Sequence, residues 1–112
     1  PTLPQQALLY RLCGDFNPLH ADPAVARAAG FERPILHGLC TFAVAGHALL
    51  RTLCDYDPAR LKALQVRFSA PVYPGETLRT EIWRGADGIA FRTLAVERKV
   101  VVLSHGRAEL RA

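Results

Sequence analysis

The stretch from His37 to Cys54 limits the possible folds of this chain more than any other part of the sequence. It is long enough for roughly five helical turns, and its large apolar residues fall on nearly every face of such a helix: Leu39, Phe42, Val44, Leu49, Leu50 and Leu53. A helix without a polar face is not stable with one side in water, so we expect other structure to surround it. His37, His47 and Arg51 interrupt the apolar run, which makes it a poor membrane span and favours a helix inside the protein.

The second half of the chain has the alternating pattern of β-strands. The expected strands lie at 64–68, 78–82, 89–96 and 100–110. Turn residues separate them at Tyr73–Glu76 and at Gly85–Gly88. One long helix followed by antiparallel strands predicts an α+β fold, in which a sheet curls around the helix, as one domain over residues 1–112. Four strands are few for enclosing so long a helix, so we expect a missing strand or a partner.

The first third of the chain is less regular. Its helix-forming residues predict a short helix at 5–12 that ends before Gly14. Asp22 followed by Pro23 is typical of a helix N-cap with proline at the first helical position. A second short helix is therefore expected at 23–29.

The loop between these two helices carries two ionisable side chains, Asp15 and His20. Gly14 and Pro18 interrupt a regular helix there, so both side chains can project from one irregular loop. A carboxylate and an imidazole placed in this way can act on one substrate atom. An alternative stays open for each residue alone, because Asp15 and Asn17 are also common turn formers and His20 could be a structural histidine.

Composition narrows the class of protein. Half of the residues are hydrophobic, which favours a buried interface. The three cysteines, at positions 13, 40 and 54, are odd in number and lack metal-site spacing, so we expect free thiols in a reducing compartment. The net charge is +4, but the basic residues form no run apart from Arg98-Lys99, so we do not expect binding to nucleic acid.

Several spaced motifs resemble those of the MaoC-like (R)-specific enoyl-CoA hydratases, the hydratase 2 family. The first block is Gly14-Asp15-x-Asn17-Pro18-Leu19-His20-x-Asp22-Pro23. The second is Pro34-Ile35-Leu36-His37-Gly38-Leu39-Cys40-Thr41-Phe42, and the third is Arg67-Phe68-x-x-Pro71-Val72-Tyr73-Pro74-Gly75-Glu76-Thr77-Leu78. The likeness covers nearly the whole chain and is greatest to the C-terminal half of the two-part members of the family.

This resemblance implies a hot-dog fold, either whole or as one half of a double hot dog, and the reversible syn hydration of a trans-2-enoyl-CoA to the (R)-3-hydroxyacyl-CoA. It implies that Asp15 and His20 are the catalytic pair. It also implies that Asn17 is the polar residue of the motif beside the substrate and that Gly38 is the oxyanion donor. Such a reaction needs a base, an acid and donors for the charge that accumulates on the thioester oxygen. Backbone N–H groups at the start of the long helix, at Gly38, can supply those donors.

Two further residues are candidate substrate contacts. Tyr10 could touch the substrate or pack under the motif loop, and His37 could line the pocket or simply begin the long helix. A metal site made of Asp15, His20 and His37 has no supporting sequence spacing. We therefore expect no metal, and no cofactor beyond the coenzyme A that is part of the substrate.

The expected partners are an acyl-CoA substrate and either a second copy of the chain or a second hot-dog half. The bacterial cytoplasm is the expected location, and the peroxisome is the alternative. Other functions stay open: a dehydratase that acts on acyl carrier protein, a thioesterase, or a non-catalytic acyl-binding half-domain. The sequence does not fix the preferred acyl chain length.

Overall fold

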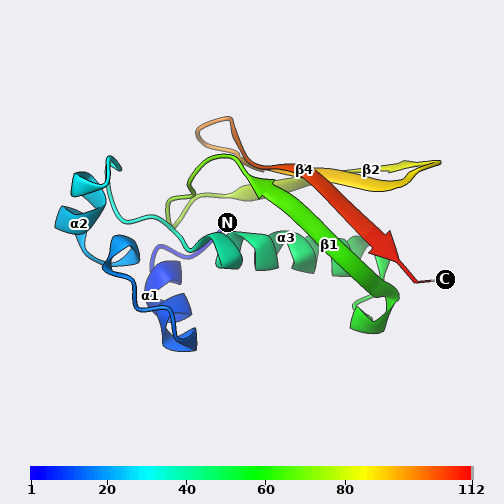
Figure 1. Cartoon of the computed structure of the whole chain (residues 1–112), viewed down its shortest axis with the longest axis horizontal. Helices are drawn as coiled ribbons and strands as arrows, with labels where there is room; N and C mark the ends of the chain where they lie inside the picture. The colour runs from blue at the N-terminus through cyan, green and yellow to red at the C-terminus, as the bar shows by residue number, and fades with distance from the viewer. Residues whose placement is uncertain (112) are drawn as a thin grey trace.

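The computed structural model describes residues 1–111 and shows one antiparallel sheet packed on one long helix (Figure 1). The strands are β1 (Leu61–Phe68), β2 (Leu78–Gly85), β3 (Gly88–Ala95) and β4 (Val100–Leu110). Their order across the sheet is β1-β4-β3-β2, so the first strand pairs with the last one. The helix α3 (Gly38–Leu53) runs along one face of this sheet. The expected α+β fold is confirmed.

Local sequence explains how the last three strands follow one another. β2 and β3 form a hairpin in which Gly85 pairs with Gly88, and Gly88 adopts a φ of 113° that glycine alone accommodates easily. Where β4 is irregular, Gly106 lies against β3. A Cβ atom on Gly106 would sit 2.5 Å from the carbonyl oxygen of Phe91, so no larger residue fits there. The inward side chains of these strands form the core with α3.

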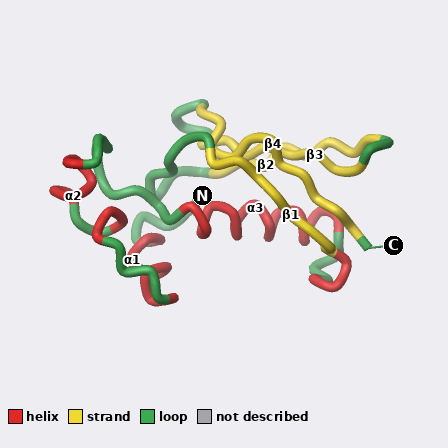
Figure 2. Tube along the Cα trace, in the orientation of Figure 1, coloured by secondary structure: helices red, strands yellow, loops and turns green. Residues whose placement is uncertain are grey.

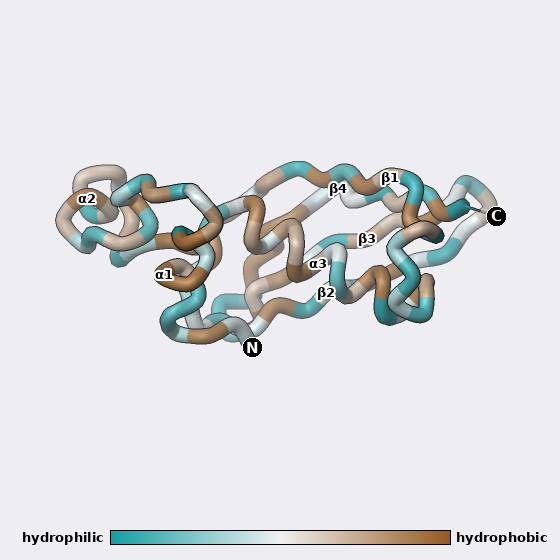
Figure 3. The backbone as a smooth tube through the Cα atoms, turned by 90° about the horizontal axis from the view of Figure 1, so that it is seen from below, coloured by the Kyte–Doolittle hydropathy of each residue, from teal (hydrophilic) through white to brown (hydrophobic). Residues whose placement is uncertain are grey.

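The sheet covers only one face of α3. Several residues of the helix are buried beneath the strands: Cys40, Thr41, Ala45, Gly46, Leu49 and Leu53. Leu39 on the opposite face is 64% exposed, and Ala43 and His47 are exposed as well. Figure 3 views the molecule from this side, with the strands behind the helix. The sheet expected to pack around this helix is present, and the four strands among residues 1–111 cover one side of it only, in agreement with the expectation that four strands are too few to enclose it.

Residues 5–37, which we call the site segment, extend past the start of α3 and away from the sheet (Figures 1 and 2). This segment contains four short helical elements: α1 (Gln6–Tyr10), η1 (Arg11–Cys13), η2 (Pro18–His20) and α2 (Pro23–Ala28). The expected helix at 5–12 is divided into an α-helical and a 3₁₀ part. Asp22 caps α2 as predicted, since its side chain accepts a hydrogen bond of 2.9 Å from the Ala24 N–H.

Residues 69–77, which we call the strap, connect β1 to β2 near the start of α3. The site segment is fastened to this strap on both sides, by Thr2 shortly before it and by Leu36 near its end. At one end Thr2 N–H donates to the Glu76 carbonyl over 3.0 Å, and at the other Leu36 N–H donates to the Val72 carbonyl over 2.7 Å. The strap is in turn bound to the β3–β4 turn, because Arg98 contacts the buried carboxylate of Glu76 at 2.6 Å.

The structure also bears on the cysteines and on the apolar helix. The cysteines are free thiols, of which Cys13 is exposed whereas Cys40 and Cys54 are buried. Among the described residues, no helix combines the length and the apolar character that crossing a bilayer requires.

Candidate active site

The loop that carries Asp15 and His20 is built from short-range contacts between side chains and backbone. Gly14, at a φ of 111°, ends η1. Asp15 then accepts a 3.2 Å hydrogen bond from the Asn17 N–H, and Asn17 accepts a 3.0 Å hydrogen bond from the Leu19 N–H at the start of η2. Asp15 and Asn17 are thus turn formers, as one of the two interpretations of the sequence held. Only Oδ1 of Asp15 is used in this way, so Oδ2 is available for chemistry.

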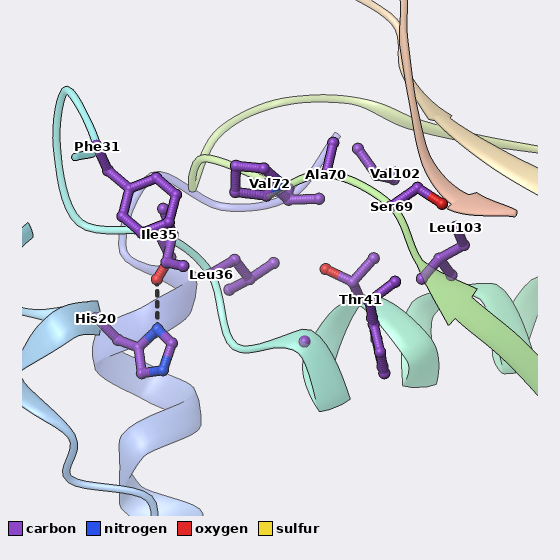
Figure 4. A pocket seen from close by; sticks show the side chains of 13 residues that line it. His20, Phe31, Ile35, Leu36, Thr41, Ser69, Ala70, Val72, Val102 and Leu103 are labelled. Atoms are coloured by element: carbon purple, nitrogen blue, oxygen red, sulfur yellow. Dashed lines mark hydrogen bonds between the residues drawn. The ribbon is translucent and has the colours of Figure 1, made fainter. Parts of the chain in front are cut away.

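The tautomer of His20 follows from its one hydrogen bond. Its Nδ1 lies 2.7 Å from the carbonyl oxygen of Ile35, as Figure 4 shows. A carbonyl oxygen only accepts, so Nδ1 must carry the proton. The neutral ring therefore has its lone pair on Nε2, which can accept a proton from a water molecule.

His37 lies directly against His20. The two rings stack with their centroids 3.8 Å apart at an angle of 26°, and the Tyr10 ring packs on His37 at 4.6 Å. His37 Nε2 donates to the backbone carbonyl of Asp15 over 3.2 Å. The His37 side chain is only 2% exposed, and this burial lowers its pKa below the ordinary value.

The structure brings the predicted catalytic pair together. One carboxylate oxygen of Asp15 and one ring nitrogen each of His20 and His37 all lie within 4.8 Å of one another. That separation suits a single water molecule, which needs about 2.8 Å to each partner.

A cavity of about 330 Å³ opens beside His20, between the start of α3, the strap and β4 (Figure 4). Its lining is mostly apolar: Phe31, Ile35, Leu36, Phe68, Ala70, Pro71, Val72, Val102 and Leu103, with Gly38, Thr41, Ser69 and His20. Gly38 lies in the first turn of α3, where backbone N–H groups have no acceptor within the helix. A Cβ atom on Gly38 would come within 3.2 Å of the Phe68 ring, so glycine keeps this corner open.

The predicted site residues fall into two groups. His20 and Gly38 line the cavity, and Asp15 stands next to His20. His37 stacks on His20 and Tyr10 packs on His37, and neither lines the cavity, so a contact of either residue with substrate stays a prediction. The same holds for Asn17.

Sequence reasoning missed the apolar wall of the cavity. Phe31 stands in an irregular connection, and Phe68 at the end of a strand is 55% exposed beside Gly38. Val102 and Leu103 were expected only as strand residues. Alternation along a strand shows which residues point inward, but it does not show which of them border a cavity.

Comparison with known families shows which family this chain belongs to. A family model described as MaoC-like domain matches residues 1–105. The chain belongs to the MaoC-like domain family. The resemblance of its motifs to hydratase 2 is thereby confirmed, since its relatives include peroxisomal multifunctional enzyme type 2 and enoyl-CoA hydratase 2.

Two curated relatives illustrate the likeness and its extent. Peroxisomal multifunctional enzyme type 2 of Mus musculus is 52% identical over 105 residues, which make up 94% of this MaoC-like chain and 14% of the relative. Peroxisomal enoyl-CoA hydratase 2 of Arabidopsis thaliana is 50% identical over 103 residues, or 92% of this chain and 33% of the relative. The chain therefore spans a third or less of these two proteins.

Solved structures confirm the hot-dog fold. Full-length peroxisomal multifunctional enzyme type 2 from Drosophila melanogaster superposes with a TM-score of 0.94 at 50% identity, over 98% of this chain and 21% of that one. The (R)-hydratase from A. caviae superposes with a TM-score of 0.73 at 26% identity, over 96% of this chain and 85% of that one.

Proposed function

We propose that the chain is the catalytic domain of an (R)-specific 2-enoyl-CoA hydratase, which adds water reversibly and in syn fashion to a trans-2-enoyl-CoA. One observation carries the proposal. The imidazole of His20, with a free Nε2, and the N-terminus of α3 at Gly38 line the same apolar cavity, while the Asp15 carboxylate lies beside His20.

The reaction follows from these positions. The water molecule is held between Asp15 and His20 Nε2, and Nε2 takes its proton as the oxygen bonds to C3 of the enoyl group. Charge then accumulates on the thioester oxygen, where N–H groups at Gly38 and the positive end of the helix dipole stabilise it. His20 returns the proton to C2 from the same side, which gives syn addition. Donors of this kind are worth about a hundredfold or more in rate.

The names of the relatives support this activity. Besides the peroxisomal hydratases, enoyl-CoA hydratase ChsH3 of Mycobacterium tuberculosis is 50% identical over 105 residues, or 93% of this chain. A second candidate is the same chemistry in the direction of dehydration. It is favoured by 3-hydroxyacyl-thioester dehydratase Y of M. tuberculosis, which is 56% identical over 95 residues.

A partner is part of the proposal. We propose that a second copy of the chain or a second hot-dog half covers the exposed face of α3 and completes the site. Leu39, one residue beyond Gly38, is 64% exposed on that face. Sedimentation or light scattering would test this, and a purely monomeric, fully active chain would argue against it.

The location also stays a proposal. We favour a bacterial cytoplasm, where free thiols such as exposed Cys13 persist, with the peroxisome as the alternative. Enoyl-CoA hydratase 2 of A. thaliana is called peroxisomal, whereas the name of the M. tuberculosis relative gives no location. Fractionation of the source cells would decide between the two.

The decisive experiment is a spectrophotometric assay with crotonyl-CoA, with the mass of the protein measured in the same buffer. The proposal expects enoyl absorbance to fall without release of free thiol, and chiral analysis to give the (R)-3-hydroxy product. Release of thiol would instead show a thioesterase. Turnover of crotonyl groups only on acyl carrier protein would favour the dehydratase. No turnover of either thioester by the folded, correctly assembled protein would refute the proposal.

A further inference from the structure

We propose that His37 is a positioning residue: it holds the backbone of Asp15 and the ring of His20 in place, and it does so as a neutral imidazole. The inference rests on the proposed hydratase function, because Asp15 and His20 are the groups that it positions. It gives His37 a role other than contact with substrate.

The contacts of His37 point away from α3, although the residue stands at the N-cap of that helix. Its side chain makes no capping hydrogen bond. Instead Nε2 reaches back to the carbonyl of Asp15, 22 positions earlier in the chain, over 3.2 Å. Nδ1 is buried and has no hydrogen-bond partner among the described residues. An apolar ring would fill the same space without an unpaired nitrogen, so the useful part of this side chain is its Nε2–H.

The Asp15 loop has little else to fix it. Between residues 5 and 35 only Ala7 and Ala26 are buried, and Asp15 itself is exposed. The hydrogen bond from His37 therefore connects the catalytic loop to the rigid start of α3. The His37 ring also stacks on the face of the His20 ring, with the two centroids 3.8 Å apart, while the carbonyl of Ile35 holds His20 at Nδ1.

The charges around His37 keep its own ring neutral. The groups that face it are Tyr10, Arg11, Asp15 and His20. Burial lowers the pKa of His37, and the positive charges of His20 and Arg11 act in the same direction, whereas the contacts with Asp15 oppose them. A proton on His37 would place two charged rings in a stack. The proton that the reaction moves is therefore carried by His20 alone.

Two substitutions separate the N–H group from the ring. His37→Phe keeps a stacking ring and loses the donor, whereas His37→Gln offers an amide N–H at about the reach of Nε2 and loses the ring. We expect His37→Phe to lower kcat on the order of a hundredfold, with KM changed less than about twofold. We expect His37→Gln to restore most of that loss. His105→Gln, at an exposed position of β4, is the matched control and should behave as the unsubstituted protein.

A second measurement does not depend on activity. ¹⁵N-detected NMR of the imidazoles should show His37 as the Nε2–H tautomer down to a pH below its ordinary pKa, and His20 as the Nδ1–H tautomer. His37→Phe should shift the carbonyl resonance of Asp15, and His105→Gln should not. If His37 has the expected tautomer in a protein that hydrates no enoyl thioester, the proposed function fails while the contact stands.

Three results would overturn the inference. The first is full kcat in His37→Phe, and the second is a larger loss of kcat in His37→Gln than in His37→Phe, which would indicate that only the packing of the ring matters. The third is a His37 ring that is already protonated at neutral pH.

Discussion

The two halves of this molecule are held together in different ways. In the sheet body, formed by α3 and β1–β4, apolar side chains such as Leu49, Val102 and Leu103 are completely buried. In the site segment, residues 5–37, most side chains are exposed or half-buried. Of ten large apolar side chains exposed among residues 1–111, five lie in this segment: Leu8, Leu9, Leu12, Phe16 and Val25.

This difference separates two tasks. The sheet body provides a rigid helix start whose N–H groups stay in one place, and burial of apolar surface stabilises it. The site segment carries the proposed reacting groups, and hydrogen bonds to backbone carbonyls and the stacking of His20 on His37 fix its geometry. Its exposed leucines are available for a partner surface. Substitutions should therefore affect activity in the site segment and stability in the body.

The largest expected effect comes from the catalytic pair. Asp15→Asn and His20→Ala should each lower crotonyl-CoA hydration by about 10²–10⁴-fold. Thermal unfolding should barely change, because Asp15 is exposed and His20 is half-buried in a segment with few core contacts. Turnover near the starting level in either variant would contradict the assigned roles. A large drop in the thermal unfolding temperature of both variants would contradict the division of tasks between the two halves.

Replacing Glu76 tests the contact with Arg98 that anchors the strap to the β3–β4 turn. Glu76→Gln should destabilise the fold by about 2 kcal/mol, because it weakens charge-assisted hydrogen bonds at a buried carboxylate and leaves Arg98 without its counter-charge. Urea unfolding measures this loss. Glu81→Gln, which removes one member of a surface ion pair with Arg92, is the control and should cost less than about 1 kcal/mol.

The same anchor should depend on pH. Burial alone would raise the pKa of Glu76, but the hydrogen bonds from Arg98 and the Tyr73 N–H outweigh it and hold the pKa below 4.5. A lowered pKa in the folded state means that the stabilisation is complete above 4.5 and is lost as the pH falls through the folded pKa. The difference in unfolding free energy between the unsubstituted protein and Glu76→Gln should shrink in that acid range. A constant difference would exclude the carboxylate as its cause.

Gly38 lies where the site segment meets the sheet body. Its substitution should lower activity less than the loss of Asp15 or His20 does. A methyl group there meets the Phe68 ring at 3.2 Å and narrows the place of the thioester, so Gly38→Ala should lower kcat/KM by about tenfold, or 1.4 kcal/mol. Gly46→Ala in the same helix is the control. Its Cβ would make only an ordinary 3.5 Å contact with Leu64, so activity should be retained. Equal activity in the two variants would remove Gly38 from the site.

The smallest effect on stability is expected for the exposed leucines. Leu8 and Leu12 are 53% and 75% exposed, so replacing both by serine should change the unfolding free energy by less than about 0.5 kcal/mol each. Light scattering should show weaker self-association if this surface contacts a second copy. A large loss of stability in the dilute chain would mean that the leucines serve the fold itself.

Much of the fold could be predicted from local chemistry. The N-cap at Asp22, the hairpin at Gly85–Gly88 and the long helix all follow from short-range preferences, and the structure has each of them. The pairing of β1 with β4 was not predicted, because periodicity gives the faces of strands and not their neighbours.

The candidate site was predictable to a smaller extent. The spacing of Asp15 and His20, with the family likeness, indicated the pair that the structure brings together. The carbonyl of Ile35 that sets the tautomer of His20, and the position of His37 beneath it, depend on contacts 15 and 22 residues apart in sequence. Such contacts arise from the tertiary arrangement, and no short-range pattern encodes them.

The fastening of Thr2 and Leu36 to the same strap has a consequence for motion. The residues between these two attachments, which are four positions apart on the strap, do not pair with any strand, so this stretch can detach as a cooperative unit without breaking a single β-ladder hydrogen bond. Amide protons between these two residues should then exchange with solvent together and earlier than those of β3 and β4. Under the proposed hydratase function, brief openings of this stretch would give a bulky thioester access to Asp15 and His20, while the helix terminus at Gly38 stays in place.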